Sequence, residues 1–182
     1  MPKKSRAPES TTLATLDRLV RSDAVRARID ATAARLERTL LTASSAQMSW
    51  EEVPLSTFGP DLPESIRSGW VFVLRAGAVT GAERHPNSHQ RTLSWRGEGD
   101  LQTRAGGRWK SHRLKSDDKA PVGRRWVSIP AGTWHQVAVR GGGHWAVLSF
   151  HTAKADELIE ERPGRNEREP GTKRRYAGES AR

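Results

Sequence analysis

The hydrophobic pattern along this chain changes its period near residue 69. Before that point, residues 24–43 place apolar side chains three to four positions apart and charged side chains opposite them, which predicts an amphipathic helix. A shorter stretch after Ser10, a residue type that caps helices, predicts a first helix over residues 11–21. We expect the longer helix to pack on its own domain, with a contact to a second copy as the alternative. Its apolar stripe comprises Val25, Ile29, Ala33, Leu36 and Leu40.

After residue 69 the pattern is that of β-strands. Short β-rich runs alternate with Gly, Pro or polar turns up to about residue 152, at spacings near ten residues. About eight such strands predict an antiparallel sandwich or barrel. Residues 50–68 are expected to be irregular, and residues 153–161 to form a short closing helix that Pro163 stops. The runs are residues 70–77, 78–85, 89–97, 100–104, 108–114, 125–129, 135–139 and 144–150.

These elements divide the chain into segments of different character. We expect the fold class to be mainly all-β, an antiparallel barrel with N-terminal helices and a short C-terminal helix. Both ends of the chain are basic, and we expect them to be disordered tails. The segments are a tail (1–9), a helical segment (10–45), a β-barrel domain with its closing helix (46–161) and a second tail (162–182).

The net charge of +10 gives little support to nucleic-acid binding once its distribution is considered. Residues 162–182 carry a net +4 and the first ten residues a net +2, so most of the charge lies on the tails. The rest is spread without a basic helix or an aromatic stacking platform, the usual features of a nucleic-acid-binding surface. We expect at most weak, salt-sensitive contact of the tails with polyanions, and no specific nucleic-acid partner.

Composition excludes further classes of function. The chain has no cysteine, which excludes disulfides, thiolate catalysis and cysteine-based zinc sites. No apolar run approaches the roughly 20 residues of a membrane-spanning helix. The basic N-terminus is not followed by the apolar segment of a secretory signal. These features predict a cytoplasmic protein without a membrane partner.

The segment ERHPNSHQ, residues 83–90, concentrates the candidate chemistry. Glu83 and His85 are two positions apart in a predicted strand, so they point to the same face. The Pro-Asn-Ser kink then turns the chain, and Gln90 begins the returning strand. Farther along, His135 opens another predicted strand. We therefore expect four candidate ligands from three strands to converge.

The spacing of these residues resembles the first motif of the cupin superfamily. That motif is a glycine, five residues, His-x-His, three or four residues, Glu, six residues and a second glycine. Here Gly77 is followed by five residues, Glu83-x-His85, four residues, Gln90, six residues and Gly97. Every spacing of the motif is therefore present.

The second cupin motif centres on Pro-x-Gly-x-x-His and is matched by Pro130, Gly132 and His135. Its leading glycine lies one position early, at Gly123, and Val139 stands in place of its final asparagine. Both motifs occur in order on a β-rich background. The resemblance implies a cupin jelly-roll barrel over roughly residues 69–152 and, because cupins commonly pair, a homodimer.

The resemblance also implies a set of metal ligands. Two positions of the usual set of three histidines and one glutamate differ in chemical type here, yet the set keeps one negative charge. Two imidazoles and a carboxylate form the facial triad typical of non-haem Fe(II), although Ni, Mn and Zn accept similar ligands. The alternative is a metal-free barrel in which these side chains satisfy one another by hydrogen bonds. The implied ligands are Glu83, also the candidate catalytic residue, His85, Gln90 and His135, with His89 as an alternative.

The residues around these implied ligands predict the character of the pocket and, with it, the kind of function. Thr92 and Ser94 share the inward face of the returning strand, and Trp134 precedes the last ligand, which predicts a polar pocket. We expect a metal-dependent enzyme that acts on a small polar substrate, with an Fe(II) oxygenase of the dioxygenase type favoured. The alternatives are a cupin isomerase or lyase, and a module that binds a small ligand or metal without turnover.

Overall fold

The computed structural model describes residues 8–164 and 171–176. Its helices are α1 (Glu9–Leu19), α2 (Asp23–Thr42), the 3-10 turn η1 (Leu55–Phe58) and α3 (Val122–Arg125). Its strands are β1 (Met48–Glu52), β2 (Ser68–Leu74), β3 (Gln90–Arg96), β4 (Glu98–Ala105), β5 (Arg108–Lys115), β6 (Trp126–Ile129), β7 (His135–Ala138), β8 (Trp145–His151), β9 (Ile159–Arg162) and β10 (Thr172–Arg175). Within these described ranges, every helix is too short or too polar to span a bilayer.

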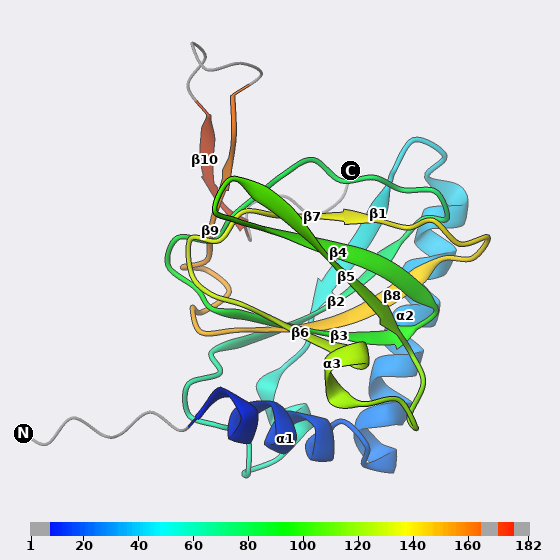
Figure 1. Ribbon diagram of the computed structural model, residues 1–182. Helices are drawn as coiled ribbons and strands as arrows, with labels where there is room; N and C mark the ends of the chain where they lie inside the picture. Colours follow the sequence, from blue (N-terminus) through cyan, green and yellow to red (C-terminus); the bar gives the residue numbers. More distant parts are fainter. Residues whose placement is uncertain (1–7, 165–170, 177–182) are drawn as a thin grey trace, which may run out of the picture.

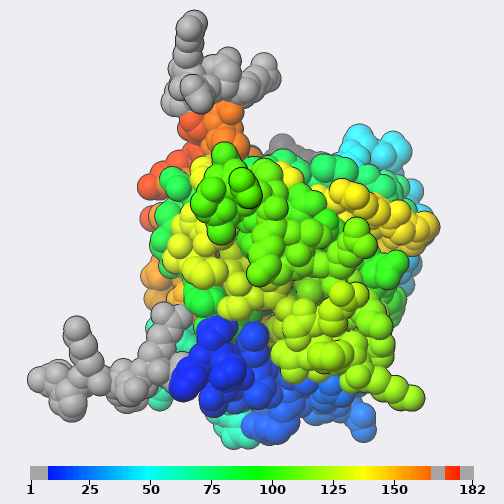
Figure 2. Space-filling model, viewed as in Figure 1, coloured from blue at the N-terminus to red at the C-terminus, as the bar shows by residue number. Residues whose placement is uncertain are grey.

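Two antiparallel sheets face each other and enclose the interior of the barrel (Figure 1). The larger sheet has the strand order β1-β2-β8-β3-β6, and the smaller sheet has the order β5-β4-β7. A third sheet pairs β9 with β10, and this hairpin rises from one end of the barrel (Figures 1 and 2). The predicted antiparallel jelly-roll barrel of the cupin fold is confirmed by this arrangement.

The N-terminal helices cover the outer face of the larger sheet (Figure 1). Ser22 caps α2, because its hydroxyl accepts a hydrogen bond from the Val25 amide (3.4 Å). All five residues of the predicted apolar stripe are buried, and they share one core with side chains of β2, β3 and β8. The helix therefore packs on its own domain, as the sequence predicts.

Strand β2 is buried along its whole length because both faces of the larger sheet are covered. Val71 and Val73 point outward into the core that the helices share, whereas Trp70 and Phe72 point into the barrel. The barrel interior also holds the indole of Trp145, which is fully buried. The side chains inside the barrel thus come from alternate positions of its strands.

Two stretches in the first half of the chain differ from the prediction. Residues 50–68 were expected to be irregular, but β1 covers their start and η1 lies among them. Strand β1 pairs with β2 along five positions even though its sequence, MSWEE, carries few apolar residues. The predicted strand over residues 78–85 is wrong, because the structure has only isolated bridges there.

The C-terminal part of the chain departs most from the prediction. The closing helix over residues 153–161 is wrong: this segment turns and then forms β9. The tail over residues 162–182 is not wholly disordered, because Thr172–Arg175 form β10 and Tyr176 is buried. Residues 1–7, 165–170 and 177–182, where the tail predictions also fall, lie outside the described residues.

Charge complementarity explains the pairing of β9 with β10. Across the ladder, Glu160 faces Arg174 and Glu161 faces Lys173, and both pairs form ion pairs. Glu160 is buried, so its neutralisation by arginine is a condition for the hairpin to form. These long-range pairs override the helical propensity of the segment before them.

Two carboxylates of helix α1, Glu9 and Asp17, hydrogen-bond to residues of the barrel and of α3. Asp17 accepts hydrogen bonds from the Arg125 guanidinium (2.8 Å) and from the Trp126 indole (2.8 Å). Burial opposes ionisation of this carboxyl, but the hydrogen bonds from Arg125 and Trp126 outweigh it and lower its pKa to about 2. The carboxylate therefore stabilises the fold at pH values above its ordinary pKa.

We predict that Asp17→Asn lowers the free energy of unfolding at pH 7 by about 1.5–3 kcal/mol, because hydrogen bonds to a charged group are lost. In the wild type this contribution fades as the pH falls from about 4 towards 2, and the variant lacks that dependence. Denaturant unfolding between pH 2 and 7 measures both effects. Asp61→Asn is the control, since Asp61 pairs with Arg18 where both side chains are 62% exposed. An equal loss in both variants would contradict the assignment.

Candidate metal centre

Backbone pairing places Glu83 beside His135. The Glu83 amide donates to the His135 carbonyl (2.9 Å), and the His135 amide donates to the Glu83 carbonyl (2.8 Å). In the turn before β7, the amide of Gly132 donates to the carbonyl of His85 (2.9 Å). Gly132 has a φ of 77°, a conformation that favours glycine. Two stretches that are far apart in the sequence are therefore held edge to edge.

Three side chains meet where these stretches join. Candidate ligand atoms of Glu83, His85 and His135 all lie within 4.8 Å of one another, and this is the one such cluster among the described residues. Nε2 of His135 is 3.5 Å from Oε1 of Glu83, and the two imidazole centroids are 5.4 Å apart. Metal–ligand bonds of about 2.0–2.2 Å put ligand atoms up to about 4 Å apart, so small side-chain shifts let one ion reach all three.

Both imidazoles of the cluster are oriented by backbone carbonyls. Nδ1 of His85 is 2.9 Å from the Ile159 carbonyl oxygen, and Nδ1 of His135 is 3.1 Å from the Thr133 carbonyl oxygen. A carbonyl only accepts hydrogen bonds, so each Nδ1 carries the proton and donates it. The lone pair of each Nε2 is then available, which is the state that a metal-binding histidine requires.

Two buried atoms in the site have no hydrogen-bond partner among the described residues. They are Nε2 of His135 and Oε1 of Gln90. The amide nitrogen of Gln90 donates to the Thr92 hydroxyl (3.1 Å), which leaves the amide oxygen unpaired. Buried polar atoms are rarely left unsatisfied in proteins, and both of these can donate a lone pair to a cation. The residues present therefore fit a metal ion.

The carboxylate of the cluster is ionised and paired. Oε2 of Glu83 accepts a hydrogen bond from Nη2 of Arg162 (2.8 Å), a residue of β9. Burial opposes ionisation of Glu83, but His135, His85 and Arg162 outweigh it and hold its pKa below the usual range. Burial, followed by the neighbouring His135, lowers the pKa of His85. The cluster thus holds an anionic oxygen beside an imidazole that favours its neutral form.

The structure adds His151 to the surroundings of the site. Its position on β8 is opposite Gln90, and its ring centroid lies 5.2 Å from that of His85. It is 1% exposed, its Nδ1 lies 3.3 Å from the Ser88 hydroxyl oxygen, and burial lowers its pKa well below the ordinary value. His151 directly follows the last predicted strand, residues 144–150, and only the register of β3 with β8 brings it to the cluster.

Tyr176 is a second residue that sequence reasoning missed. Its side chain lies inside the barrel, 7% exposed, with its ring centroid 5.7 Å from that of His85. Burial, followed by Glu83 and Glu160, raises the pKa of its phenol well above 10, so the hydroxyl keeps its proton. No local signal marks this residue, since it lies in the segment predicted to be a disordered tail.

The alternative ligand His89 lies away from the cluster. Its Nε2 is 2.7 Å from the hydroxyl oxygen of Ser128 and 3.6 Å from a carboxylate oxygen of Glu9, on the side of the sheet that α1 covers. Next to the first residue of β3, strand alternation turns it opposite to Gln90. The structure therefore brings Glu83, His85 and His135 together and keeps His89 apart.

A small cavity of about 50 Å³ adjoins the cluster. Its volume has room for a few water molecules or for a ligand of a few non-hydrogen atoms. Its polar lining includes Glu83, Gln90, Thr92, His135 and Tyr176, and its apolar lining includes Met48, Phe72, Leu101, Trp145 and Val147. The expected polar wall is formed in part by Gln90 and Thr92, but the facing strands contribute apolar side chains that the sequence did not predict.

The other two predicted pocket residues do not line this cavity. The hydroxyl of Ser94 accepts a hydrogen bond from the Trp145 indole (2.8 Å) and donates to the Gly97 carbonyl (3.1 Å). Trp134 lies under the guanidinium of Arg84, 4.6 Å from its carbon to the ring centroid, and borders a separate hollow beside the hairpin. Trp134 is adjacent to His135 in the sequence, but its side chain does not line the cavity beside the cluster.

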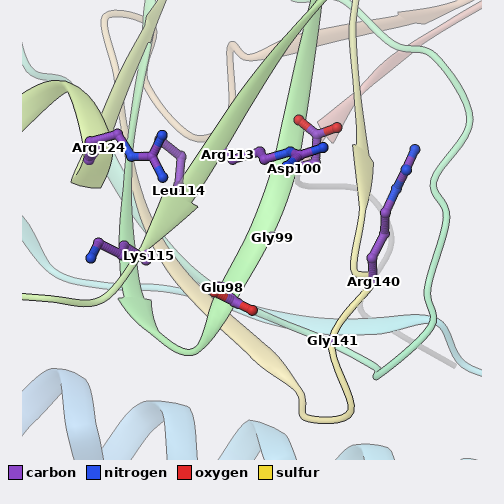
Figure 3. Close-up of a pocket in the computed structure, with 9 residues that line it drawn as sticks. All are labelled: Glu98, Gly99, Asp100, Arg113, Leu114, Lys115, Arg124, Arg140 and Gly141. Atoms are coloured by element: carbon purple, nitrogen blue, oxygen red, sulfur yellow. The ribbon is translucent and has the colours of Figure 1, made fainter.

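A wider hollow of about 440 Å³ lies elsewhere, between the ends of β4 and β5 and the loop after β7 (Figure 3). It is basic, and Figure 3 shows Arg124 and Arg140 at opposite sides of it. Of the two acidic residues that line it, Asp100 already accepts hydrogen bonds from Ser111 and Gln102. None of the predicted site residues lines this hollow, so it is separate from the cluster of Glu83, His85 and His135.

We predict that Gln90→Leu leaves the melting temperature of the metal-free protein unchanged or raises it, because the change removes a buried oxygen that has no partner. Thr92→Val is the matched variant: it deprives the Gln90 amide of its acceptor and should lower the free energy of unfolding by about 1–3 kcal/mol. Thermal unfolding followed by circular dichroism measures both. A clear fall in melting temperature for Gln90→Leu would show that the oxygen has a partner in solution.

No family model matches this chain, and no curated protein matches it. Among solved structures, oxalate oxidase in complex with the substrate analogue glycolate has 13% identity and a TM-score of 0.48, covering 62% of this chain and 54% of that chain. CapF, a capsular polysaccharide assembling protein from Staphylococcus aureus, has 18% identity and a TM-score of 0.47, covering 62% of this chain. An oxalate decarboxylase has 14% identity, a TM-score of 0.47 and 60% coverage of this chain. This chain spans 24–30% of the CapF chains that it matches.

Proposed function

We propose that this cupin-fold chain is a metal-dependent enzyme in which Glu83, His85 and His135 hold one divalent ion. The observation that carries the proposal is that Nδ1 of both histidines lies within hydrogen-bond distance of a backbone carbonyl, which assigns the proton of each neutral ring to Nδ1 and leaves Nε2 available. The buried Nε2 of His135, which has no hydrogen-bond partner among the described residues, supports it further. A metal-free core whose side chains satisfied one another would pair that atom.

Fe(II) is the favoured ion. Two imidazoles and one carboxylate leave coordination positions open, and the amide oxygen of Gln90 offers a weak further ligand. When bound, Fe(II) would polarise substrate oxygens and supply the redox chemistry of an oxygenase. Ni, Mn and Zn remain compatible with the same nitrogen and oxygen donors.

The residues around the ion limit the substrate. The cavity of about 50 Å³ admits only a small molecule. Because part of its lining is polar and part is apolar, it favours a substrate with a polar end and an apolar side. Oxygens of the substrate would face Glu83 and His135, where the Thr92 hydroxyl and the protonated Tyr176 phenol are potential hydrogen-bond partners. The apolar lining would exclude water from the opposite side.

The second candidate is a module that binds a metal or small ligand without turnover. The observation in its favour is the small size of the cavity, about 50 Å³, which Tyr176 lines. Such a module would hold the ion through the same three side chains. In either function, the homodimer expected from the resemblance stays a prediction.

We predict about one equivalent of a divalent metal in the purified protein, with iron the favoured element. Glu83→Ala and His135→Ala should each lower the affinity for Fe²⁺ at least tenfold, because each removes a ligand of the proposed site. Elemental analysis and anaerobic titration with Fe²⁺ measure these effects. His89→Ala is the control and should bind as the wild type does. A wild type that binds no divalent metal would exclude both candidates in their metal-dependent form.

We predict that the Fe²⁺-loaded protein consumes O2 with a small substrate, and that Glu83→Ala abolishes this activity. An oxygen electrode, with a panel of small carboxylic acids, phenols and hydroxyketones, measures it. A thermal-shift screen with the same panel identifies compounds that bind. Compounds that stabilise the protein without any O2 uptake or product would favour the non-catalytic module.

A further inference from the structure

One ligand of the proposed metal site is oriented by the C-terminal part of the chain. The proton on Nδ1 of His85 is donated to the carbonyl of Ile159, the first residue of β9. This carbonyl lies 74 positions later in the sequence than the ring that it orients. The direction of Nε2 of His85 therefore depends on where β9 docks.

Asn87 fixes the start of β9 at that place. Its side-chain nitrogen donates to the Glu157 carbonyl (2.7 Å), and its side-chain oxygen accepts from the Ile159 amide (3.1 Å). Asn87 is two residues beyond His85, in the same Pro-Asn-Ser turn. The Pro-Asn-Ser turn therefore holds Ile159 through the side chain of Asn87, and the carbonyl of Ile159 in turn holds the imidazole of His85.

The same C-terminal segment contacts the site at two further points. Arg162 donates to Oε2 of Glu83 (2.8 Å) and to Oε1 of Glu160 (2.7 Å). Tyr176, which follows β10, packs edge-on against His85 with an interplanar angle of 79°. Two of the three proposed ligands therefore have their outer contacts in residues 157–176.

We propose that Asn87 is a positioning residue for His85 and that docking of residues 157–164 is coupled to metal binding. This proposal rests on the metal site proposed above. A carbonyl that accepts from a histidine ligand fixes the ring and increases its basicity, so the docked segment favours the metal-bound state. Because coupling is reciprocal, a bound ion also stabilises the docked segment.

Asn87 allows a cleaner test than Arg162. The guanidinium of Arg162 orients Glu83 but also repels a nearby cation, so its removal has two opposing effects on metal affinity. Asn87 is neutral, and its side chain is exposed, so replacing it changes no charge and opens no cavity. Its effect on metal affinity therefore has one expected direction.

The experiment compares Asn87→Ala with the control Thr152→Val in the full chain. The Thr152 hydroxyl accepts a hydrogen bond from the His89 amide (2.9 Å), so the control loses one hydrogen bond on the other side of the same turn. Anaerobic titration gives the affinity for Fe²⁺, with Ni²⁺ in parallel. Hydrogen exchange of the peptide 157–164, with and without metal, reports its docking.

We expect Asn87→Ala to lower the affinity by a factor of about 10–100, the usual effect of losing an outer contact of a metal ligand. The control should bind within about threefold of the wild type, and metal should slow exchange in residues 157–164 of the wild type and the control but not of Asn87→Ala. Equal affinity in Asn87→Ala and the wild type would overturn this proposal alone. Equal loss in both variants would also overturn it, since the effect would then be general. Absence of binding in the wild type would overturn the metal site itself.

Discussion

The chemistry of this barrel depends on the hydrogen bonds that fix the tautomers of His85 and His135. Each ring has two nitrogens, and only one arrangement of the proton leaves Nε2 able to bind a cation. Backbone carbonyls of Ile159 and Thr133 select that arrangement, because they cannot donate a proton in return. The bridge between Glu83 and His135 then brings a carboxylate oxygen to the same place. Without these contacts, the three side chains would have many alternative pairings.

The scaffold keeps these contacts in place by burying both faces of the larger sheet. Helix α2 packs on the outer face, while the inner face carries Gln90 and His151 towards the site. Strand positions therefore cannot shift by one residue without moving apolar side chains into the polar cluster. The N-terminal helices take no part in the site, but they stabilise the sheet that presents it. Precise placement of the candidate ligands follows from this two-sided packing.

The sequence predicts the part of the site that depends on local spacing. Glu83 and His85 are close in sequence, and the turn that precedes His135 is marked by its own motif at Gly132. The pair and the turn can therefore be placed from the sequence alone. His151 could not, because its approach depends on the register between β3 and β8. The sequence did not identify Arg162 and Tyr176 as site residues for a different reason. The composition of the C-terminal segment is that of a disordered basic tail, and only pairing with the acidic β9 gives it structure.

Tyr176 is the only tyrosine in the chain, and it lies among aromatic rings. Its ring centroid is 5.6 Å from that of Trp70, 6.1 Å from Trp50 and 6.2 Å from Phe72. Ring currents from these neighbours displace the magnetic resonance signals of its protons. A protein produced with isotope-labelled tyrosine therefore yields a single spin system that reports, without any attached probe, whether Tyr176 lies inside the barrel.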